Sequence, residues 1–167
     1  MNKILLIDGH SILNRAFYGV PPLTNFEGLH TNAVYGFINI MLKSLEDEHA
    51  DYIAVAFDLK APTFRHEMFA EYKGTRKPMP QELHEQVPVI KEVLAAMTIP
   101  VITLEGYEAD DILGTLAKRC QRDGFEVSIL SGDRDLLQLA DEHIKIRMPK
   151  TVKGQTSICL VYTSDAA

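Results

Sequence analysis

Short apolar runs in this chain end repeatedly in carboxylates, and this pattern restricts its fold more than any other feature. The runs and their acidic ends are 4–7 with Asp8, 52–57 with Asp58, 100–104 before Glu108, Asp110 and Asp111, and 127–130 before Asp133 and Asp135. Continuous apolar runs of this length are typical of buried parallel strands. Because ligands of open parallel sheets bind beyond the carboxyl ends of the strands, we expect these acidic side chains to share one crevice.

A crevice of this composition predicts a metal site. Two like charges about 4 Å apart repel by roughly 4 kcal/mol at an effective dielectric of about 20, so a dense carboxylate cluster needs cations. Ligand sets made only of oxygen select hard ions, and we expect Mg²⁺ or Mn²⁺. Each acid also has a structural interpretation, since Asp110 and Asp111 fit a helix start and Asp133 fits an N-cap. The coincidence of several strand ends favours the metal site.

Composition and charge narrow the class of protein. The chain has 167 residues, of which 46% are hydrophobic and 24% charged, as expected for one α/β domain with a sizeable core. A net charge of -6 argues against a protein that coats nucleic acid indiscriminately. Cys120 and Cys159 are too few for a disulfide scaffold or a paired-cysteine zinc site. Without a signal peptide or membrane-spanning stretch, we expect a cytoplasmic protein that does not contact a membrane.

Periodicity along the chain predicts alternating strands and helices. Expected strands are 3–8, 52–58, 100–104, 126–131 and 144–147, and expected helices are 32–48, 81–97 with a break at Pro88, 109–122, and a short helix after Asp133. Residues 9–30, with Pro21, Pro22, Asn25 and Gly28, are expected to form a loop. Helical crossovers between parallel strands predict an α/β fold, a doubly wound and mainly parallel sheet with helices on both faces.

The segment 60–80 has neither strand nor helix periodicity, and its middle part interleaves cations with aromatic residues. Long loops of this kind are usually functional. Cations can neutralise phosphates while an aromatic ring stacks on an unpaired base, so we expect nucleic-acid contacts here. The candidate DNA-binding residues are Arg65, Tyr72, Lys73, Arg76 and Lys77. A solvated loop with aromatic anchors is the alternative, because Glu67 and Glu71 reduce the positive charge.

Several motifs together resemble one family. They are Asp8-Gly9-His10-Ser11, Arg15-Ala16-Phe17-Tyr18, residues 31–37, Phe57-Asp58, residues 63–67, residues 72–76, Gly106-Tyr107-Glu108-Ala109-Asp110-Asp111 and Ser131-Gly132-Asp133-Arg134-Asp135. In this combination the chain is similar to the 5′-to-3′ exonuclease domain of bacterial DNA polymerase I, from Met1 to about Gly154. The resemblance implies a flap endonuclease fold related to PIN domains.

The resemblance also implies roles for individual residues. It assigns two divalent ions to Asp8, Asp58, Glu108, Asp110, Asp111, Asp133 and Asp135. It places Lys73 and Arg76 as catalytic cations at the base of an arch, here about 60–97, through which a 5′ single strand passes. Arg15 and Tyr18 match DNA-binding positions beside the active site. The implied partner is DNA with a 5′ flap, a nick or a 5′ single strand, and the domain is expected to be linked to a polymerase domain.

The C-terminal part departs from the family pattern. Two further metal-site aspartates and a helix-hairpin module, which the family implies, do not occur in the sequence. We therefore expect a nuclease domain over 1–154 and a tail of uncertain origin over 155–167, in a truncated reading frame or a short protein.

The leading hypothesis is a metal-dependent 5′-to-3′ DNA exonuclease or flap endonuclease that acts in replication and repair. In this hypothesis, two ions activate a water and stabilise the leaving 3′ oxygen, which yields a 5′-phosphate. A PIN-type ribonuclease shares the carboxylates and is one alternative. A catalytically weak DNA-binding fragment is the other.

Overall fold

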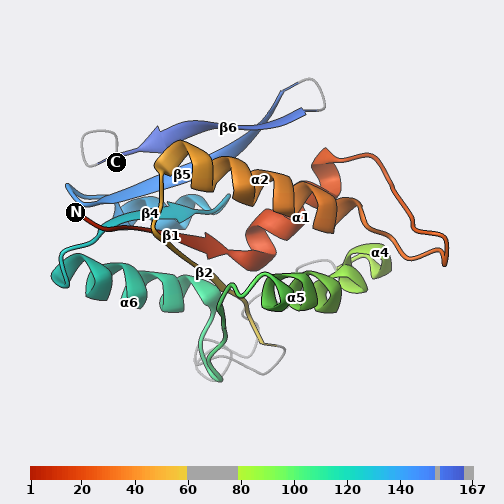
Figure 1. Ribbon diagram of the computed structural model, residues 1–167, viewed down its shortest axis with the longest axis horizontal. Coiled ribbons are helices and arrows are strands. Elements are labelled where there is room, and N and C mark those ends of the chain that lie inside the picture. Colours follow the sequence, from red (N-terminus) through yellow and green to blue (C-terminus); the bar gives the residue numbers. More distant parts are fainter. Residues whose placement is uncertain (60–78, 153–154, 164–167) are drawn as a thin grey trace.

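One six-stranded sheet organises the chain, in the order β3-β2-β1-β4-β5-β6 (Figure 1). The computed structural model describes residues 1–59, 79–152 and 155–163. The strands are β1 Lys3–Asp8, β2 Tyr52–Ala56, β3 Val101–Ile102, β4 Glu126–Leu130, β5 Ile144–Val152 and β6 Gln155–Tyr162. The helices are α1 Gly9–Gly19, α2 Asn32–Glu48, α4 Gln81–His84, α5 Gln86–Ala96, α6 Ala109–Arg122 and the 3-10 helix η1 Arg134–Leu139.

The first five strands of the chain are parallel, with β1 at the centre between β2 and β4. Ile4 of β1 lies opposite Tyr52 of β2 on one side and opposite Val127 of β4 on the other. Strand β6 pairs antiparallel with β5 at the edge of the sheet. The carboxyl ends of β1, β2 and β4 therefore meet at the same edge, which is the geometry that a strand-end site needs.

Alternation along the strands builds a core on each face of the sheet. Leu5 and Ile7 of β1 pack in a cluster with buried residues of α1, α2, α4 and α5. Leu6 points to the opposite cluster, which contains buried residues of α6 and η1. Helix α6 accordingly lies across the sheet from α1 and α2 (Figure 1). These two layers confirm the expected doubly wound, mainly parallel sheet with helices on both faces.

Helix α1 corrects the sequence interpretation, which expected a loop from residue 9. Ile12, Leu13 and Ala16 are buried on one side of α1 at helical spacing. The turn formers begin only at Pro21, after the helix has ended at Gly19. The turn formers from Pro21 onward therefore indicate a loop only after Gly19, and not over residues 9–19.

The other boundaries differ in smaller ways. The expected helix 81–97 is divided at Glu85 into α4 and α5. Pro88 explains the division, because it has no N–H to donate to the carbonyl of His84, four residues earlier. Strand β6 was not expected from the sequence at all. Among the described residues, no helix has the length and apolar character that a membrane span requires.

Candidate metal centre

A cavity of about 880 Å³ opens at the carboxyl edge of the sheet. Its lining includes acidic residues from separate parts of the chain: Asp8, Asp58, Glu108, Asp110 and Asp133. Asp8 is the last residue of β1, Asp58 follows β2, and Asp133 follows β4. The structure thus brings together most of the acids that the sequence nominated, as strand ends in a parallel sheet should be.

Asp8 is the most buried of the strand-end acids, with 7% of its surface exposed. Burial raises the pKa of Asp8 from 3.8 to about 6, and the negative charge of Asp58 adds to this rise. The Ser131 hydroxyl opposes it by donating a hydrogen bond of 2.9 Å to Asp8 Oδ2. A bound cation would favour the charged form of this carboxylate further.

Asp58 connects the end of β2 to the start of α6. Its Oδ1 accepts a hydrogen bond of 2.6 Å from the backbone N–H of Ala109. Its carbonyl oxygen lies 3.3 Å from Nε2 of His10, so this nitrogen donates. The Nδ1 atom of His10 is buried and has no hydrogen-bond partner among the described residues. The side chain of Asp58 is therefore held by the backbone of Ala109, which lies between the acids Glu108 and Asp110.

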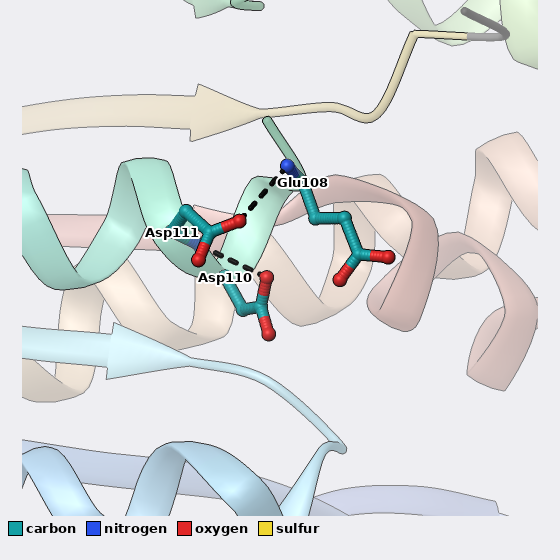
Figure 2. A group of neighbouring side chains, drawn as sticks. All are labelled: Glu108, Asp110 and Asp111. Carbon is teal, nitrogen blue, oxygen red and sulfur yellow. Dashed lines mark hydrogen bonds between the residues drawn. The ribbon is translucent and has the colours of Figure 1, made fainter. Parts of the chain in front are cut away.

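Helix α6 begins with three acids, Glu108, Asp110 and Asp111, whose ligand atoms all lie within 4.8 Å of one another. Figure 2 shows them gathered at the first turn. Asp111 Oδ2 accepts a hydrogen bond of 3.1 Å from the N–H of Glu108, and Asp110 Oδ1 accepts one of 2.9 Å from the N–H of Asp111. Asp111 does not line the cavity, whereas Glu108 and Asp110 do. The helix-start interpretation therefore describes Asp111 better than the other two acids.

Asp133 and Asp135 differ in a similar way. Asp133 lines the cavity and is the N-cap of η1, where its Oδ1 accepts a hydrogen bond of 2.9 Å from the N–H of Asp135. Asp135 is exposed and is not part of the cavity lining. Asp133 thus both caps η1 and lines the cavity, whereas Asp135 lies outside the cavity lining.

The predicted DNA-binding residues are only partly described. Arg15 is partly buried beside the loop after β4, since a Cβ atom added to Gly132 would lie 3.3 Å from its Nη2. Tyr18 is 69% exposed and packs edge-on against Phe17, with ring centroids 5.0 Å apart. The remaining candidates lie outside the described residues: Arg65, Tyr72, Lys73, Arg76 and Lys77. The same holds for residues 60–78 of the expected arch.

Several residues of the site were not nominated from the sequence, among them His10, Ser131 and Lys91. His10 and Ser131 are adjacent to nominated positions and belong to quoted motifs, so their proximity could have been inferred. Lys91 also lines the cavity, with its Nζ 5.2 Å from the centre of the Phe57 ring. Lys91 lies within the expected arch range of about 60–97, but it was not nominated as a site residue, because its position beside the strand ends depends on the tertiary packing of α5.

The donor set fits a hard divalent cation. The cavity acids supply carboxylate oxygens, which Mg²⁺ and Mn²⁺ prefer. Burial and the neighbouring carboxylates raise the pKa of Asp8, so a bound cation would favour its charged form. An acidic cluster that could hold a metal ion is present at the start of α6, where it consists of Glu108, Asp110 and Asp111.

Comparison with known families gives a match over nearly the whole chain. A sequence model described as "5'-3' exonuclease, N-terminal resolvase-like domain" matches residues 3–164. The chain belongs to this family. The match extends beyond Gly154 and includes all of β6, a region to which the motif resemblance did not extend.

Curated relatives are DNA polymerases I of bacteria. The chain is 53% identical to the DNA polymerase I of Bacillus caldotenax over 156 residues, and 52% identical to that of Bacillus subtilis (strain 168) over 156 residues. Each match covers 93% of this chain and 18% of the relative. The chain thus spans less than a fifth of the length of these relatives and corresponds to their N-terminal nuclease segment.

Solved structures share the fold at low sequence identity. The T5 D15 protein co-crystallised with metal ions has a TM-score of 0.67 and 22% identity, over 88% of this chain and 54% of that chain. The bacteriophage T5 D15 flap endonuclease in a pseudo-enzyme-product complex with DNA and metal ions has a TM-score of 0.67 and 22% identity, over 88% of this chain and 55% of that chain. The fold is thus that of PIN-like 5′ nucleases.

Proposed function

We propose that this chain is the metal-binding part of a 5′-to-3′ DNA exonuclease and flap endonuclease, as in DNA polymerase I, where it would act in replication and repair. One observation carries the proposal. Acids from three strand ends and from the start of α6 line a single cavity in a chain of the 5′-3′ exonuclease family. Metal-dependent hydrolysis of a phosphodiester uses divalent cations that such clustered carboxylates can hold.

The cofactor we propose is Mg²⁺ or Mn²⁺, held by Asp8, Asp58, Glu108, Asp110 and Asp133. When bound, such ions lower the pKa of water and offset charge on the phosphate oxygens. The protein groups keep the carboxylates in place for this task. Ser131 donates to Asp8, and the N–H of Ala109 donates to Asp58, so both acids are oriented before any ion arrives.

The proposed substrate is DNA with a 5′ flap, a nick or a 5′ single strand. Solved structures with the same fold include a complex of the T5 flap endonuclease with DNA and a complex of the catalytic core of Rad2 with a DNA substrate. Lys73 and Arg76 would offset charge on the phosphate in the transition state. Arg15 and Tyr18 would contact DNA beside the cavity, and Arg65, Tyr72 and Lys77 would contact the single strand.

The test is cleavage of a labelled 5′-flap substrate with Mg²⁺ and with Mn²⁺. It uses the 167-residue chain and a chain extended by the C-terminal portion of a relative, each with Asp110→Asn or Asp133→Asn. We expect each substitution to remove cleavage without loss of folding, since it relieves carboxylate repulsion. Glu105→Gln is the matched control, because Glu105 is exposed just before α6 and does not line the cavity.

The same assay separates the alternatives. Cleavage of an RNA flap in preference to a DNA flap would favour a PIN-type ribonuclease. Flap binding without turnover in both chain lengths would favour a DNA-binding fragment. Full activity of the Asp110→Asn variant would exclude the proposed metal centre.

A further inference from the structure

A buried pair of side-chain amides joins four helices, α1, α2, α4 and α5, near the cavity. Gln86, at the start of α5, is fully buried. Its Oε1 accepts hydrogen bonds from the backbone N–H groups of Ala33 (2.8 Å) and Val34 (3.1 Å) in the first turn of α2. Thr31, the N-cap residue of α2, makes no side-chain cap hydrogen bond. Gln86 therefore caps α2 from another helix, more than fifty residues away in sequence.

Asn32 extends this connection to α1. Its Nδ2 donates to the carbonyl oxygens of Phe17 (3.0 Å) and Val20 (3.1 Å), at the end of α1. Gln86 Nε2 donates to Asn32 Oδ1 (2.9 Å) and to the carbonyl oxygen of Glu82 in α4 (2.9 Å). Both donors and two acceptor positions of the Gln86 amide are used. An amide network with its groups satisfied in this way fixes the relative position of its helices.

A second contact holds the corner at which α4 meets α5, next to Gln86. The side chain of Glu85, between α4 and α5, accepts hydrogen bonds from the His30 backbone N–H (3.0 Å) and from His30 Nδ1 (2.7 Å). The corner of α4 and α5 is thus held to the segment that precedes α2. Because α1 starts directly after Asp8, this corner is also fixed relative to the carboxylates.

Helix α5, which these contacts hold in place, also contributes Lys91 to the lining of the cavity. The Nζ of Lys91 lies 5.2 Å from the centre of the Phe57 ring. Phe57 is fully buried and precedes Asp58, and its ring lies so close to Gly9 that an added Cβ would come within 2.6 Å. A cation over an aromatic face is attracted to it, so the ring holds the ammonium beside the strand ends.

The charge of Lys91 is unusual for its surroundings. Among the described residues that line the cavity, it is the single lysine or arginine, and the acids come from the strand ends and the start of α6. The Lys91 ammonium lies over a ring and forms no ion pair within 4.0 Å with a described carboxylate. A phosphodiester that enters the cavity would meet this ammonium on α5, where it could form a charge-assisted hydrogen bond.

We infer that Lys91 contacts a phosphate of the DNA substrate, and that Gln86 and Asn32 are positioning residues that hold α5 so that Lys91 stays beside the carboxylates. This inference rests on the proposed nuclease function for its ligand. The placement of Lys91 by the amide pair is a separate statement about the protein alone, and the experiment measures the two parts independently.

The first measurement is binding of a labelled 5′-flap DNA to the 167-residue chain in EDTA, which prevents turnover, over a range of salt concentrations. We expect Lys91→Ala to weaken binding about tenfold and to reduce the salt slope by roughly 0.9, the value for one phosphate contact. Lys91→Arg should restore binding. Lys118→Ala is the control, since Lys118 is exposed on α6 and does not line the cavity.

The second measurement is a double-mutant cycle with Gln86→Met, which keeps the length of the side chain and removes its hydrogen bonds. If Gln86 positions Lys91, Lys91→Ala should weaken binding less than threefold in the Gln86→Met background. Circular dichroism on each variant sets a temperature at which all are folded. A tenfold effect of Lys91→Ala in both backgrounds would overturn the positioning role.

The third measurement needs no DNA. The methylene protons next to Lys91 Nζ should show an upfield ring-current shift from Phe57 by NMR, and this shift should be lost in Gln86→Met. A shift that persists would overturn positioning by Gln86. Unchanged flap binding by Lys91→Ala, with measurable binding by the unmodified chain, would overturn the phosphate contact. No flap binding by the unmodified chain would count against the proposed function and the phosphate contact together, while the NMR result would still decide the positioning role.

Discussion

Two buried carboxylates in this protein, Asp8 in the cavity and Glu48 on α2, behave in opposite ways. Both are nearly inaccessible, with 7% and 5% of their surfaces exposed. Burial by itself raises the pKa of each. The pKa of Asp8 stays raised, at about 6, with Asp58 and Asp133 adding negative charge nearby. The pKa of Glu48 is instead lowered below its usual value, because Arg147 and Lys145 more than offset the effect of burial.

The partners explain the contrast. Glu48 Oε1 accepts a hydrogen bond of 2.6 Å from Arg147 Nη1, and its Oε2 lies 3.3 Å from Lys145 Nζ. Among the described residues, Asp8 has the Ser131 hydroxyl as its side-chain donor, in addition to a backbone hydrogen bond from Ser11. The contact between α2 and β5 therefore carries its own cations, whereas no lysine or arginine among the described residues forms an ion pair with Asp8. This difference separates a carboxylate that stabilises the fold from one that is suited to bind a ligand.

The largest expected effect comes from removing the charge of Glu48. In Glu48→Gln, the buried Arg147 guanidinium loses its closest carboxylate, and breaking a buried ion pair typically costs about 3 to 5 kcal/mol. We expect the lower part of this range, since Asp47 Oδ2 remains 3.2 Å from Arg147 Nη2. Urea unfolding at pH 7 measures the loss. Glu46→Gln, an exposed change on the same helix, should alter stability by less than about 0.5 kcal/mol.

The pH dependence of this loss follows from the lowered pKa of Glu48. A carboxyl with a lowered pKa in the folded state stabilises the protein above its usual pKa of 4.5, and this contribution is lost as the pH falls through the folded value. The difference between Glu48→Gln and the unmodified chain should therefore shrink below about pH 4.5. A difference that stays constant with pH would show that the loss comes from packing.

Asp8→Asn should have the opposite sign. Because the pKa of Asp8 rises from 3.8 to about 6 on folding, the folded state binds its proton more tightly than the unfolded state. Stability of the metal-free chain must then fall as the pH rises between these values. The substitution should stabilise the chain by up to roughly 3 kcal/mol above pH 6, at about 1.4 kcal/mol per pKa unit, and by little below pH 4.

Unfolding of the two amide variants across pH 4 to 8 in EDTA provides the comparison. Asp8→Asn and Glu48→Gln make the same chemical change, so each is the control for the other. If Asp8→Asn were less stable than the unmodified chain at pH 8, the charged Asp8 carboxylate would not lower the stability of the metal-free fold.

Sequence reasoning identified the sheet because its strands carry a strong local signal. The limits of β1, α2 and α6 agree closely with the expected ranges, since each has apolar spacing that matches its period. The failures have specific causes. Helix α1 was obscured by turn formers that follow it, and β6 depends on pairing with β5, which local pattern does not encode.

The candidate site shows the same division. Strand-end position brought Asp8, Asp58 and Asp133 to one cavity as predicted, because the topology of a parallel sheet determines where strands end. Side-chain direction was not predictable in the same way, so Asp111 and Asp135 lie outside the cavity lining. The contacts of Gln86 with α2 and of Lys91 with Phe57 join residues more than thirty positions apart, and a single sequence contains no sign of such pairs.

Divalent metal should stabilise the cavity around Asp8 and should not affect the contact between α2 and β5 around Glu48. Adding Mg²⁺ or Mn²⁺ at pH 7.5 should raise the free energy of unfolding of the unmodified chain, by about 2.7 kcal/mol at one hundred times the dissociation constant. The gain should be smaller in Asp8→Asn and should decrease below pH 6, where Asp8 becomes protonated. In Glu48→Gln the metal-induced gain should be unchanged. Ca²⁺-free thermal scans with each ion measure it, and an equal gain in Asp8→Asn would place the ion elsewhere.

The smallest effect tests what holds Asp8 in its charged form without metal. Ser131 is fully buried, and its hydroxyl donates to Asp8 Oδ2 while accepting a hydrogen bond of 3.0 Å from the N–H of Asp133. Ser131→Ala removes the donor that lowers the pKa of Asp8, so this pKa should rise further. Stability at pH 7 should fall by about 1 to 2 kcal/mol, and by less at pH 4, where Asp8 is largely neutral in the folded state.

Carboxyl ¹³C shifts of Asp8 against pH report the pKa directly, and urea unfolding at the two pH values reports the stability. Ser11→Ala is the matched control, because the Ser11 hydroxyl accepts a hydrogen bond of 2.8 Å from the N–H of Gly132, whereas Asp8 is bonded by the Ser11 backbone, which alanine retains. It should lower stability without moving the titration of Asp8. If both variants moved the titration of Asp8 equally, the cause would be a change in the whole loop. The hydrogen bond from the Ser131 hydroxyl would then not be what lowers the pKa of Asp8.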